Sequence, residues 1–212
     1  FKNINDCFLY KKHYSRQTIK ILKLSIIIVN YKSSHFIKDC LRSAIAFESY
    51  KNFEWIIVDN DSKDQSKEIL LKEFPFLQWH DMGYNAGFAR ANNAGIKLAK
   101  GESILLVNPD TIILNDAINI CLQEFTKSAN VACGVQMLNP DLSPQISGNH
   151  FMKGGLNHLL PLPYWGSLLK WIAGLFKIQK PSIEIASSIE IVDWISGAFL
   201  MIKRVIHYKY LK

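Results

Sequence analysis

The sequence predicts an α/β fold in which a mostly parallel sheet is covered by helices on both faces. Short, nearly continuous apolar runs rich in β-branched residues recur along the chain, and residues 24–29 (LSIIIV) are the clearest example. Such runs are typical of strands buried on both faces. Each run is followed by a segment with helical apolar spacing, and this alternation favours right-handed crossovers into a parallel sheet. The 212 residues are enough for one substantial core.

The first strand–helix unit starts at residue 24. The strand at residues 24–29 leads to Ser33 and Ser34, either of which could cap a helix. The spacing of the apolar residues that follow predicts one buried helical face. Its expected members are Phe36, Ile37, Cys40, Leu41, Ala44 and Ile45.

The second unit repeats this pattern. Residues 55–58 (WIIV) predict a strand, and Asp61 or Ser62 could cap the helix after it. That helix is expected to run through residues 69–71 and to end before Pro75, because the residue before a proline disfavours the helical conformation.

The remaining elements follow in order. A weaker strand is predicted at residues 76–80, and a helix at residues 87–100 that Gly101 is placed to end. A fourth strand is predicted at residues 103–107. A fifth is predicted at residues 131–137. Between these last two, Asn115 could cap a helix whose apolar side is Ile118, Cys121, Leu122 and Phe125.

Composition excludes several classes of protein. The net charge of +7 suits an anionic partner, either nucleotide phosphates or a membrane surface. No long basic run with interleaved aromatic residues is present, so nucleic acid is not expected as the main partner. No signal peptide and no apolar run of about 20 residues is visible. Cys40 and Cys121 fall on apolar helix faces and are expected to be reduced core residues, which favours a cytoplasmic protein.

Polar side chains stand at the end of each predicted strand. The first strand ends in Asn30-Tyr31, and the others lead into residues 59–61, 81–85 and 108–110. In open α/β sheets, ligands bind outside the carboxyl ends of the strands. Asn-Pro-Asp is also typical of an ordinary turn, but the recurrence at four strand ends favours a binding site.

The kind of chemistry is narrowed by the motifs that the chain lacks. No G-x-G-x-x-G follows the first strand, and no P-loop or nucleophile elbow is present. The acidic rim that remains suits a divalent cation, because Mg²⁺ is typically held by one or two carboxylates together with substrate phosphates. Such a metal would stabilise charge on a leaving diphosphate.

Five segments in order resemble glycosyltransferase family 2, the nucleotide-sugar-dependent enzymes with the Rossmann-like GT-A fold. The chain looks most similar to the branch that includes many bacterial rhamnosyltransferase-like proteins. The resemblance covers residues 24–204. It depends on the segments SIIIVNYKS (25–33), IIVDNDSKD (56–64), NAGFARANNAGI (85–96), LLVNPD (105–110) and VDWISGAFLMIKR (192–204).

The resemblance implies roles for the residues that match the motifs. Val29 and Tyr31 would line the pocket of the nucleotide base, with Tyr31 packing on the base. Asp59 and Asn60 would hydrogen-bond the base or ribose, although Asn60 stands where many relatives carry a second aspartate.

The diphosphate, donor sugar and metal are expected further along the chain. Asn85, Gly87 and Asn93 would shape the loop and helix start near the diphosphate and sugar. Asp110 would ligate Mg²⁺ or Mn²⁺, and Asn108 could contribute a neutral oxygen or contact the sugar. The expected acceptor-side residues are Trp194, Ser196, Gly197 and Ala198.

The resemblance also sets the expected domain boundaries. Residues 1–22 would be a leader segment, and residues 23–212 a GT-A domain with a nucleotide-binding half (23–110) and an acceptor-side half (111–212). Family members of this type carry a further acidic motif that supplies the catalytic base. No carboxylate follows Asp193 here, so we expect an incomplete C-terminal end, with the base supplied from beyond this chain.

Residues 155–177 (GLNHLLPLPYWGSLLKWIAGLFK) allow two interpretations. One is a flap over the acceptor site or a partner surface, which is slightly favoured. The other is an in-plane membrane helix with Trp165, Trp171 and Phe176 at the headgroup boundary. A peripheral position on the inner face of the cell membrane would suit the second interpretation.

The predicted function is that of an inverting, metal-dependent glycosyltransferase. It would transfer a sugar from a nucleotide-diphosphate donor to an acceptor hydroxyl on a surface polysaccharide or lipid-linked glycan. Two alternatives remain open: a truncated, non-catalytic nucleotide-sugar-binding domain, and a sugar nucleotidyltransferase. Against the nucleotidyltransferase alternative, this chain lacks the glycine-rich phosphate loop that such an enzyme is expected to carry near the first strand.

Overall fold

The computed structural model describes residues 23–149 and 189–204 of the chain. The predicted leader (1–22), the apolar segment at 155–177 and the final residues 205–212 lie outside the described residues.

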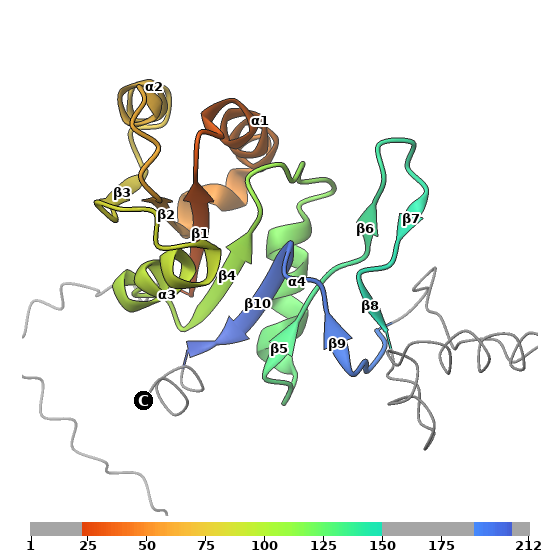
Figure 1. The fold of residues 1–212 in the computed structure, drawn as a ribbon. Helices are drawn as coiled ribbons and strands as arrows, with labels where there is room; N and C mark the ends of the chain where they lie inside the picture. The colour runs from red at the N-terminus through yellow and green to blue at the C-terminus, as the bar shows by residue number, and fades with distance from the viewer. Residues whose placement is uncertain (1–22, 150–188, 205–212) are drawn as a thin grey trace, which may run out of the picture.

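A six-stranded sheet forms the centre of the described structure (Figure 1). Its strands are Leu24–Asn30 (β1), Glu54–Asp59 (β2), Gln78–Asp81 (β3), Ser103–Val107 (β4), Ala132–Cys133 (β5) and Phe199–Lys203 (β10). The spatial order is β3-β2-β1-β4-β10-β5. β1 pairs in parallel with β2 and β4, and β2 pairs in parallel with β3. β10 runs antiparallel to β4 and β5, so the predicted mostly parallel sheet is confirmed.

Helices cover both faces of this sheet, as predicted. They span Ser34–Ile45 (α1), Ser66–Glu73 (α2), Phe88–Leu98 (α3) and Ala117–Lys127 (α4), with a 3₁₀ turn at Glu48–Asn52 (η1). Ile26 and Ile28 of β1 face the larger core cluster, which includes buried residues of α1, α2 and α4. Ile27 and Val29 face the smaller cluster under α3. The alternation follows from the two-residue period of a strand.

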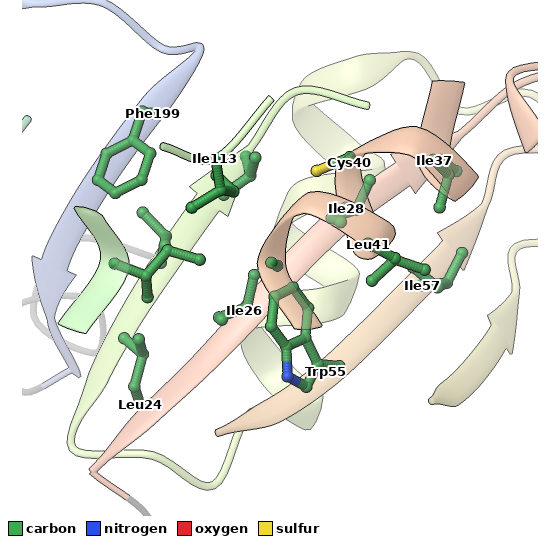
Figure 2. Close-up of a cluster of buried hydrophobic side chains, with 14 of the residues drawn as sticks. Leu24, Ile26, Ile28, Ile37, Cys40, Leu41, Trp55, Ile57, Ile113 and Phe199 are labelled. Carbon is green, nitrogen blue, oxygen red and sulfur yellow. The ribbon is translucent and has the colours of Figure 1, made fainter. Parts of the chain in front are cut away.

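The larger cluster joins elements that are far apart in the sequence. Figure 2 shows side chains of β1, β2, β10 and α1 packed together, with Ile113 from the segment after β4 among them. Every residue of β1 is buried. Each fully buried Leu or Ile stabilises the fold by roughly 1.5–3 kcal/mol. The inner strand β1 therefore contributes a large share of the stabilising apolar burial.

The predicted helix caps differ from those observed. α2 begins at Ser66 rather than after Asp61 or Ser62, because Ser62 is used in the turn after β2 and Asp64 instead accepts the Ser66 backbone N–H at 2.9 Å. The residue that precedes α4 is Asp116, not Asn115. Its carboxylate accepts hydrogen bonds from Ser49 and Asn119 rather than capping the helix.

Two further predictions about helix residues are wrong. Phe36 is 48% exposed and does not belong to the buried face of α1. Gly101 does not end α3, which stops at Leu98. A Cβ at Gly101 would lie 2.6 Å from the backbone nitrogen of Ser25, so this glycine allows a close approach of the α3–β4 turn to β1.

The amino edge of the sheet carries a buried carboxylate. Glu54, the first residue of β2, is 4% exposed. It accepts hydrogen bonds from the Ser25 hydroxyl, from Gln78 Nε2 at 2.9 Å and from the Lys100 backbone N–H at 2.8 Å. The Gly101 N–H donates to Ser25 Oγ at 2.8 Å. These bonds fasten the α3–β4 turn to the edge of the sheet.

The segments after α4 are shorter than predicted. The fifth strand was expected at residues 131–137 but pairs only at Ala132–Cys133. A Cβ at Gly134 would lie 2.4 Å from Ile195 Cγ2, so the chain leaves the sheet where another segment packs on it. Two small two-stranded antiparallel sheets lie beyond the β5 side of the main sheet (Figure 1): β6 (Met137–Leu138) with β7 (Pro144–Gln145), and β8 (Gly148–Asn149) with β9 (Trp194–Ile195).

Strand β10 was not predicted, although its sequence FLMIK resembles the other strands. Within the described residues, no helix is long and apolar enough to cross a bilayer.

Candidate functional site

Four parallel strands bring their carboxyl ends to one edge of the sheet. The strand order reverses between β1 and β4, since β2 and β3 are added on one side of β1 and β4 on the other. Ligands of open α/β sheets bind at such a switch point. Here β1 ends at Asn30 and β4 at Val107. Asn30 is in register with Asp59, and Asp59 with Asp81, so three polar residues stand side by side across the edge.

A buried hydrogen-bond network lies at the ends of β1 and β2. Asp59 Oδ1 accepts hydrogen bonds from Asn30 Nδ2 at 2.7 Å and from the Ser62 hydroxyl at 2.6 Å. Asp59 Oδ2 accepts the Ser62 backbone N–H at 3.0 Å. A carboxylate has about four lone-pair positions, and three are used here. Asp59 therefore holds the loop after β2 in place and has little capacity left for a ligand.

Asn60 extends this network to the loop that precedes α3. Its backbone N–H donates to the Asn30 carbonyl at 2.8 Å, and its Nδ2 donates to Asn85 Oδ1 at 2.9 Å. Asn60 Oδ1 accepts the Ala86 backbone N–H at 2.9 Å, and Asn85 Oδ1 accepts the Gly87 N–H at 3.1 Å. Gly87 has a φ of 82°, which favours glycine, and α3 begins directly after it. The network thus fixes the start of α3.

The other predicted nucleotide residues differ in exposure. Tyr31 follows β1 and is 48% exposed, with Lys32 Nζ 5.7 Å from its ring centroid. Its ring is therefore available to pack against a flat ligand. Val29 packs in the smaller core cluster and is 6% exposed. Asn93 lies on α3 and is partly buried.

Asp110 is the exposed carboxylate nearest to the end of β4 in the sequence. The turn before it is held by two backbone bonds: Asn108 N–H donates to the Ala198 carbonyl at 3.0 Å, and Thr111 N–H donates to the Asn108 carbonyl at 3.2 Å. Burial raises the pKa of Cys40 on α1 to about 12, and the nearby charge of Asp110 adds to the effect. The Asp110 carboxylate makes no hydrogen bond or ion pair with the described residues.

A metal would not be held by the described residues alone. No group of three or more His, Cys, Asp or Glu side chains in residues 23–149 and 189–204 is arranged to hold an ion. An exposed, unpartnered carboxylate does fit a Mg²⁺ or Mn²⁺ ion that takes its remaining ligands from water and substrate phosphates. Metal affinity would then depend on the bound diphosphate.

The predicted acceptor-side segment reaches the end of β4 in part. Ala198 contacts Asn108 through the backbone bond given above, and the Ala198 N–H donates to Ser196 Oγ at 3.2 Å. The Ser196 N–H donates to the Ser147 carbonyl at 2.7 Å. Gly197 is exposed between them. Trp194 instead lies on β9, in the two-stranded sheet with β8, and is 38% exposed.

A half-open cavity of about 290 Å³ lies beside Asp59. Two lysines in its lining are paired, Lys63 with Asp61 at 3.2 Å and Lys67 with Asp81 at 2.7 Å. The hydrogen bond from Lys67 lowers the pKa of the Asp81 carboxyl. Acidic side chains outnumber lysines, so the cavity disfavours phosphate and suits an uncharged group with N–H donors. Its lining is Asp59, Asp61, Lys63, Asp64, Ser66, Lys67, Glu68, Trp79, Asp81 and Gly83.

Asn30 and Ser62 were not among the predicted site residues. The position of Asn30 could have revealed it, because a buried amide at the last position of an apolar strand needs a partner. Ser62 was interpreted as a helix cap, and nothing in its local sequence indicates the contact with Asp59.

The family model described as "Glycosyl transferase family 2" matches residues 25–191, more than half of the chain. Among solved structures, the S. aureus TarS 1-349 complex with UDP-GlcNAc superposes with a TM-score of 0.52 and 24% identity. It covers 71% of this chain and 47% of that one, and the likeness supports the GT-A fold.

Among curated proteins, the similar relatives are polysaccharide synthases and other glycosyltransferases. The poly-beta-1,6-N-acetyl-D-glucosamine synthase of Staphylococcus epidermidis is 32% identical over 132 residues, which are 60% of this chain and 30% of the relative. The hyaluronan synthase of Pasteurella multocida is 31% identical over 57% of this chain and 12% of its own length. Glycosyltransferase GlyG of Streptococcus pneumoniae is 30% identical over 116 residues, which are 52% of this chain and 38% of the relative. The chain thus matches well under half of each relative's length.

Proposed function

Because the chain belongs to glycosyl transferase family 2, we propose that it binds a nucleotide-diphosphate sugar at the carboxyl edge of its sheet and transfers the sugar to an acceptor hydroxyl. One observation carries the proposal. At the switch point, an exposed aromatic ring and an exposed carboxylate, Tyr31 and Asp110, follow the ends of the neighbouring strands β1 and β4, and a buried network of Asn30 and Asp59 lies at the end of β1.

The base and the diphosphate would occupy different parts of this edge. The acidic cavity beside Asp59 suits an uncharged base with N–H donors, and the Tyr31 ring could stack on such a base. The diphosphate would lie towards Asp110, where a Mg²⁺ or Mn²⁺ ion would neutralise its charge as it leaves. Asn85, Gly87 and Asn93 would border the diphosphate and sugar from the α3 side.

The rest of the machinery would orient the sugar and the acceptor. Asn60 and Asn85 would keep the α3 loop in position, and Asn108 would present its amide to the sugar. The acceptor would approach from Trp194 and the Ser196–Ala198 segment, which lies beside Asn108. Direct attack of the acceptor hydroxyl at the anomeric carbon, opposite the leaving diphosphate, would invert the configuration without a covalent enzyme intermediate.

The acceptor is proposed to be a growing surface polysaccharide or a lipid-linked glycan. The synthase relatives support this class, since hyaluronan and poly-N-acetylglucosamine are polysaccharides. A cytoplasmic position at the inner face of the cell membrane would bring the site to such acceptors, and for residues 155–177 both interpretations, a flap and a membrane contact, stay open. The rhamnosyltransferase-like branch stays a prediction, and the proposal does not depend on it.

Calorimetric titration tests the donor site. UDP and dTDP are titrated into the protein without metal, with Mg²⁺ and with Mn²⁺. We expect at least one nucleotide to bind, and metal to raise its affinity by about tenfold or more. Asp110→Ala should remove the gain from metal and leave the metal-free affinity unchanged. If neither nucleotide binds under any condition, the proposed donor site is wrong. Release of sugar from UDP-GlcNAc then separates an active transferase from a binding domain.

A further inference from the structure

Two cysteines outside the proposed donor site lie next to each other. Cys121 is on α4 and Cys133 is on β5, and their Sγ atoms are 3.2 Å apart. Both side chains are partly exposed, and both pack against the larger core cluster. The third described cysteine, Cys40, is 1% exposed and serves as an internal comparison. Within the described residues, all three are free thiols.

We propose that Cys121 and Cys133 are an oxidation site, a dithiol that closes into an intrachain disulfide when the protein meets a peroxide. A disulfide needs an S–S distance of about 2.05 Å, so the two sulfur atoms must approach by roughly 1 Å. Side-chain rotation and a small shift of the short strand β5 can provide this movement. No rearrangement of the core is needed, because the two thiols already share a hydrogen bond.

The shared hydrogen bond also distinguishes the two thiols. It lowers the pKa of Cys121 and raises the pKa of Cys133, where burial acts in the same direction. Cys121 is therefore the thiol that loses its proton more readily, and Cys133 is the partner that stays protonated. Thiolate character and exposure together control the oxidation of cysteine.

The reaction balances with one hydrogen peroxide molecule. The Cys121 thiolate attacks the O–O bond and becomes a sulfenic acid, and the departing hydroxide takes up the proton first lost by Cys121. The Cys133 sulfur then attacks the sulfenic sulfur, so that an S–S bond forms and the S–O bond breaks. The second hydroxide leaves with the Cys133 proton as water. Two thiols lose two electrons, and one peroxide becomes two waters.

The disulfide would tie a helix to a strand that has little other support. β5 contains only two paired residues, and within the described residues it pairs with β10 alone. Cys133 itself is in register with Met201 of β10. A covalent bond to α4 would hold β5 in place and restrict the unfolded chain. Oxidation should therefore stabilise this side of the sheet.

The test uses the full chain with Cys7→Ser, because Cys7 lies outside the described residues. This variant retains three of the four cysteines. It is treated with hydrogen peroxide, unfolded, and titrated for free thiols. We expect one thiol, Cys40, to remain. Trypsin should release residues 101–127 and 128–153 as one linked species, lighter by two hydrogens than the two peptides together. The melting temperature of the oxidised protein should rise by several degrees.

Two single variants complete the design. Cys121→Ser and Cys133→Ser, each in the Cys7→Ser background, should show neither the linked peptides nor the rise in melting temperature. Reduction with dithiothreitol should restore all three thiols of the parent protein. The proposal is overturned if the two cysteines stay alkylatable after oxidation, if they become separate sulfinic acids, or if the only disulfide formed joins two protein molecules.

Discussion

Strand β2 carries a buried carboxylate at each end, and the two ends differ in their surroundings. Glu54 at the amino edge is 4% exposed, and Asp59 at the carboxyl edge is 8% exposed. Each accepts three hydrogen bonds from protein groups. Around Glu54 the α3–β4 turn closes over the edge, whereas the carboxyl edge also carries the exposed side chains of Tyr31 and Asp110, which follow β1 and β4.

The comparison shows that a buried carboxylate with three protein hydrogen bonds does not by itself indicate a ligand site. Both carboxylates fasten turns to the sheet. The carboxyl edge differs because it also carries exposed side chains, Tyr31 and Asp110, that a ligand could contact. Ligand binding would then depend on the exposed residues directly and on Asp59 mainly through the position of its loop.

The largest expected effect is at the amino edge. Glu54→Ala removes the acceptor of the buried Ser25 hydroxyl and of the Gln78 amide, and it leaves the Lys100 N–H with only its longer bond to Ser25 Oγ at 3.2 Å. Loss of a buried charged acceptor should lower the free energy of unfolding by roughly 3 kcal/mol. Urea unfolding measures this loss. The affinity of the folded protein for nucleotide should be unchanged, and a weaker affinity would show that the two edges are not independent.

A somewhat smaller loss is expected for Asp59→Ala. Asn30 and Ser62 lose their acceptor, which should lower the free energy of unfolding by about 2 kcal/mol and also weaken nucleotide binding. Ser62→Ala should reproduce both effects at about 1 kcal/mol, because it loosens the same loop. The matched control is Glu124→Ala on α4, where an exposed ion pair with Lys127 contributes less than about 1 kcal/mol. If Asp59→Ala weakens nucleotide binding but Ser62→Ala does not, Asp59 contacts the ligand directly rather than through its loop.

The next effect depends on pH. Folding raises the pKa of Cys40 from 9.0 to about 12. The unfolded chain therefore loses this proton first, and the stability contributed by the neutral thiol is lost as pH rises from 9 towards 12. The slope is at most about 1.4 kcal/mol per pH unit. Urea unfolding under reducing conditions should show that wild-type protein loses stability faster than Cys40→Ala over this range. Equal slopes would contradict the assigned burial.

The smallest stability change is expected at Asp110. Its carboxylate is exposed and makes no hydrogen bond or ion pair with the described residues, so Asp110→Asn should change the free energy of unfolding by less than about 0.5 kcal/mol. The same variant should lose the metal-dependent part of nucleotide binding. A large loss of stability in urea would indicate a structural turn residue instead and would weaken the contrast between the two edges.

Sequence reasoning found the elements whose signal is local. β1, β2 and β4 have apolar runs that only a buried strand accommodates, and α1 and α3 have clear helical spacing. The rule that parallel strands end at one edge also predicted the neighbourhood of Asn30, Asp59 and Asp81. The predicted roles of the site residues in binding and catalysis stay predictions.

Features that depend on distant contacts were not predicted. Asp59 accepts hydrogen bonds from Asn30, which is 29 positions away, and from Ser62, which is 3 positions away. The apolar periodicity of the sequence does not predict such contacts. The predicted cap of α2 was wrong because Ser62 bonds to Asp59 after β2, and that of α4 was wrong because the helix is preceded by Asp116 rather than Asn115. The close approach at Gly134 shortened the fifth strand. Strand β10 did have a signal, the apolar run FLMI, but its segment was interpreted only as part of the acceptor side.

The position of β10 also bears on how the chain assembles during synthesis. Residues 199–203 leave the ribosome after all the other strands of the main sheet, yet they fill the place between β4 and β5. Until then, among the described strands, β4 has an open hydrogen-bonding edge and β5 has no paired neighbour. Open edges invite pairing with other chains. A nascent protein whose residues 199–203 are still inside the ribosome should therefore be more prone to aggregate than one in which these residues have emerged.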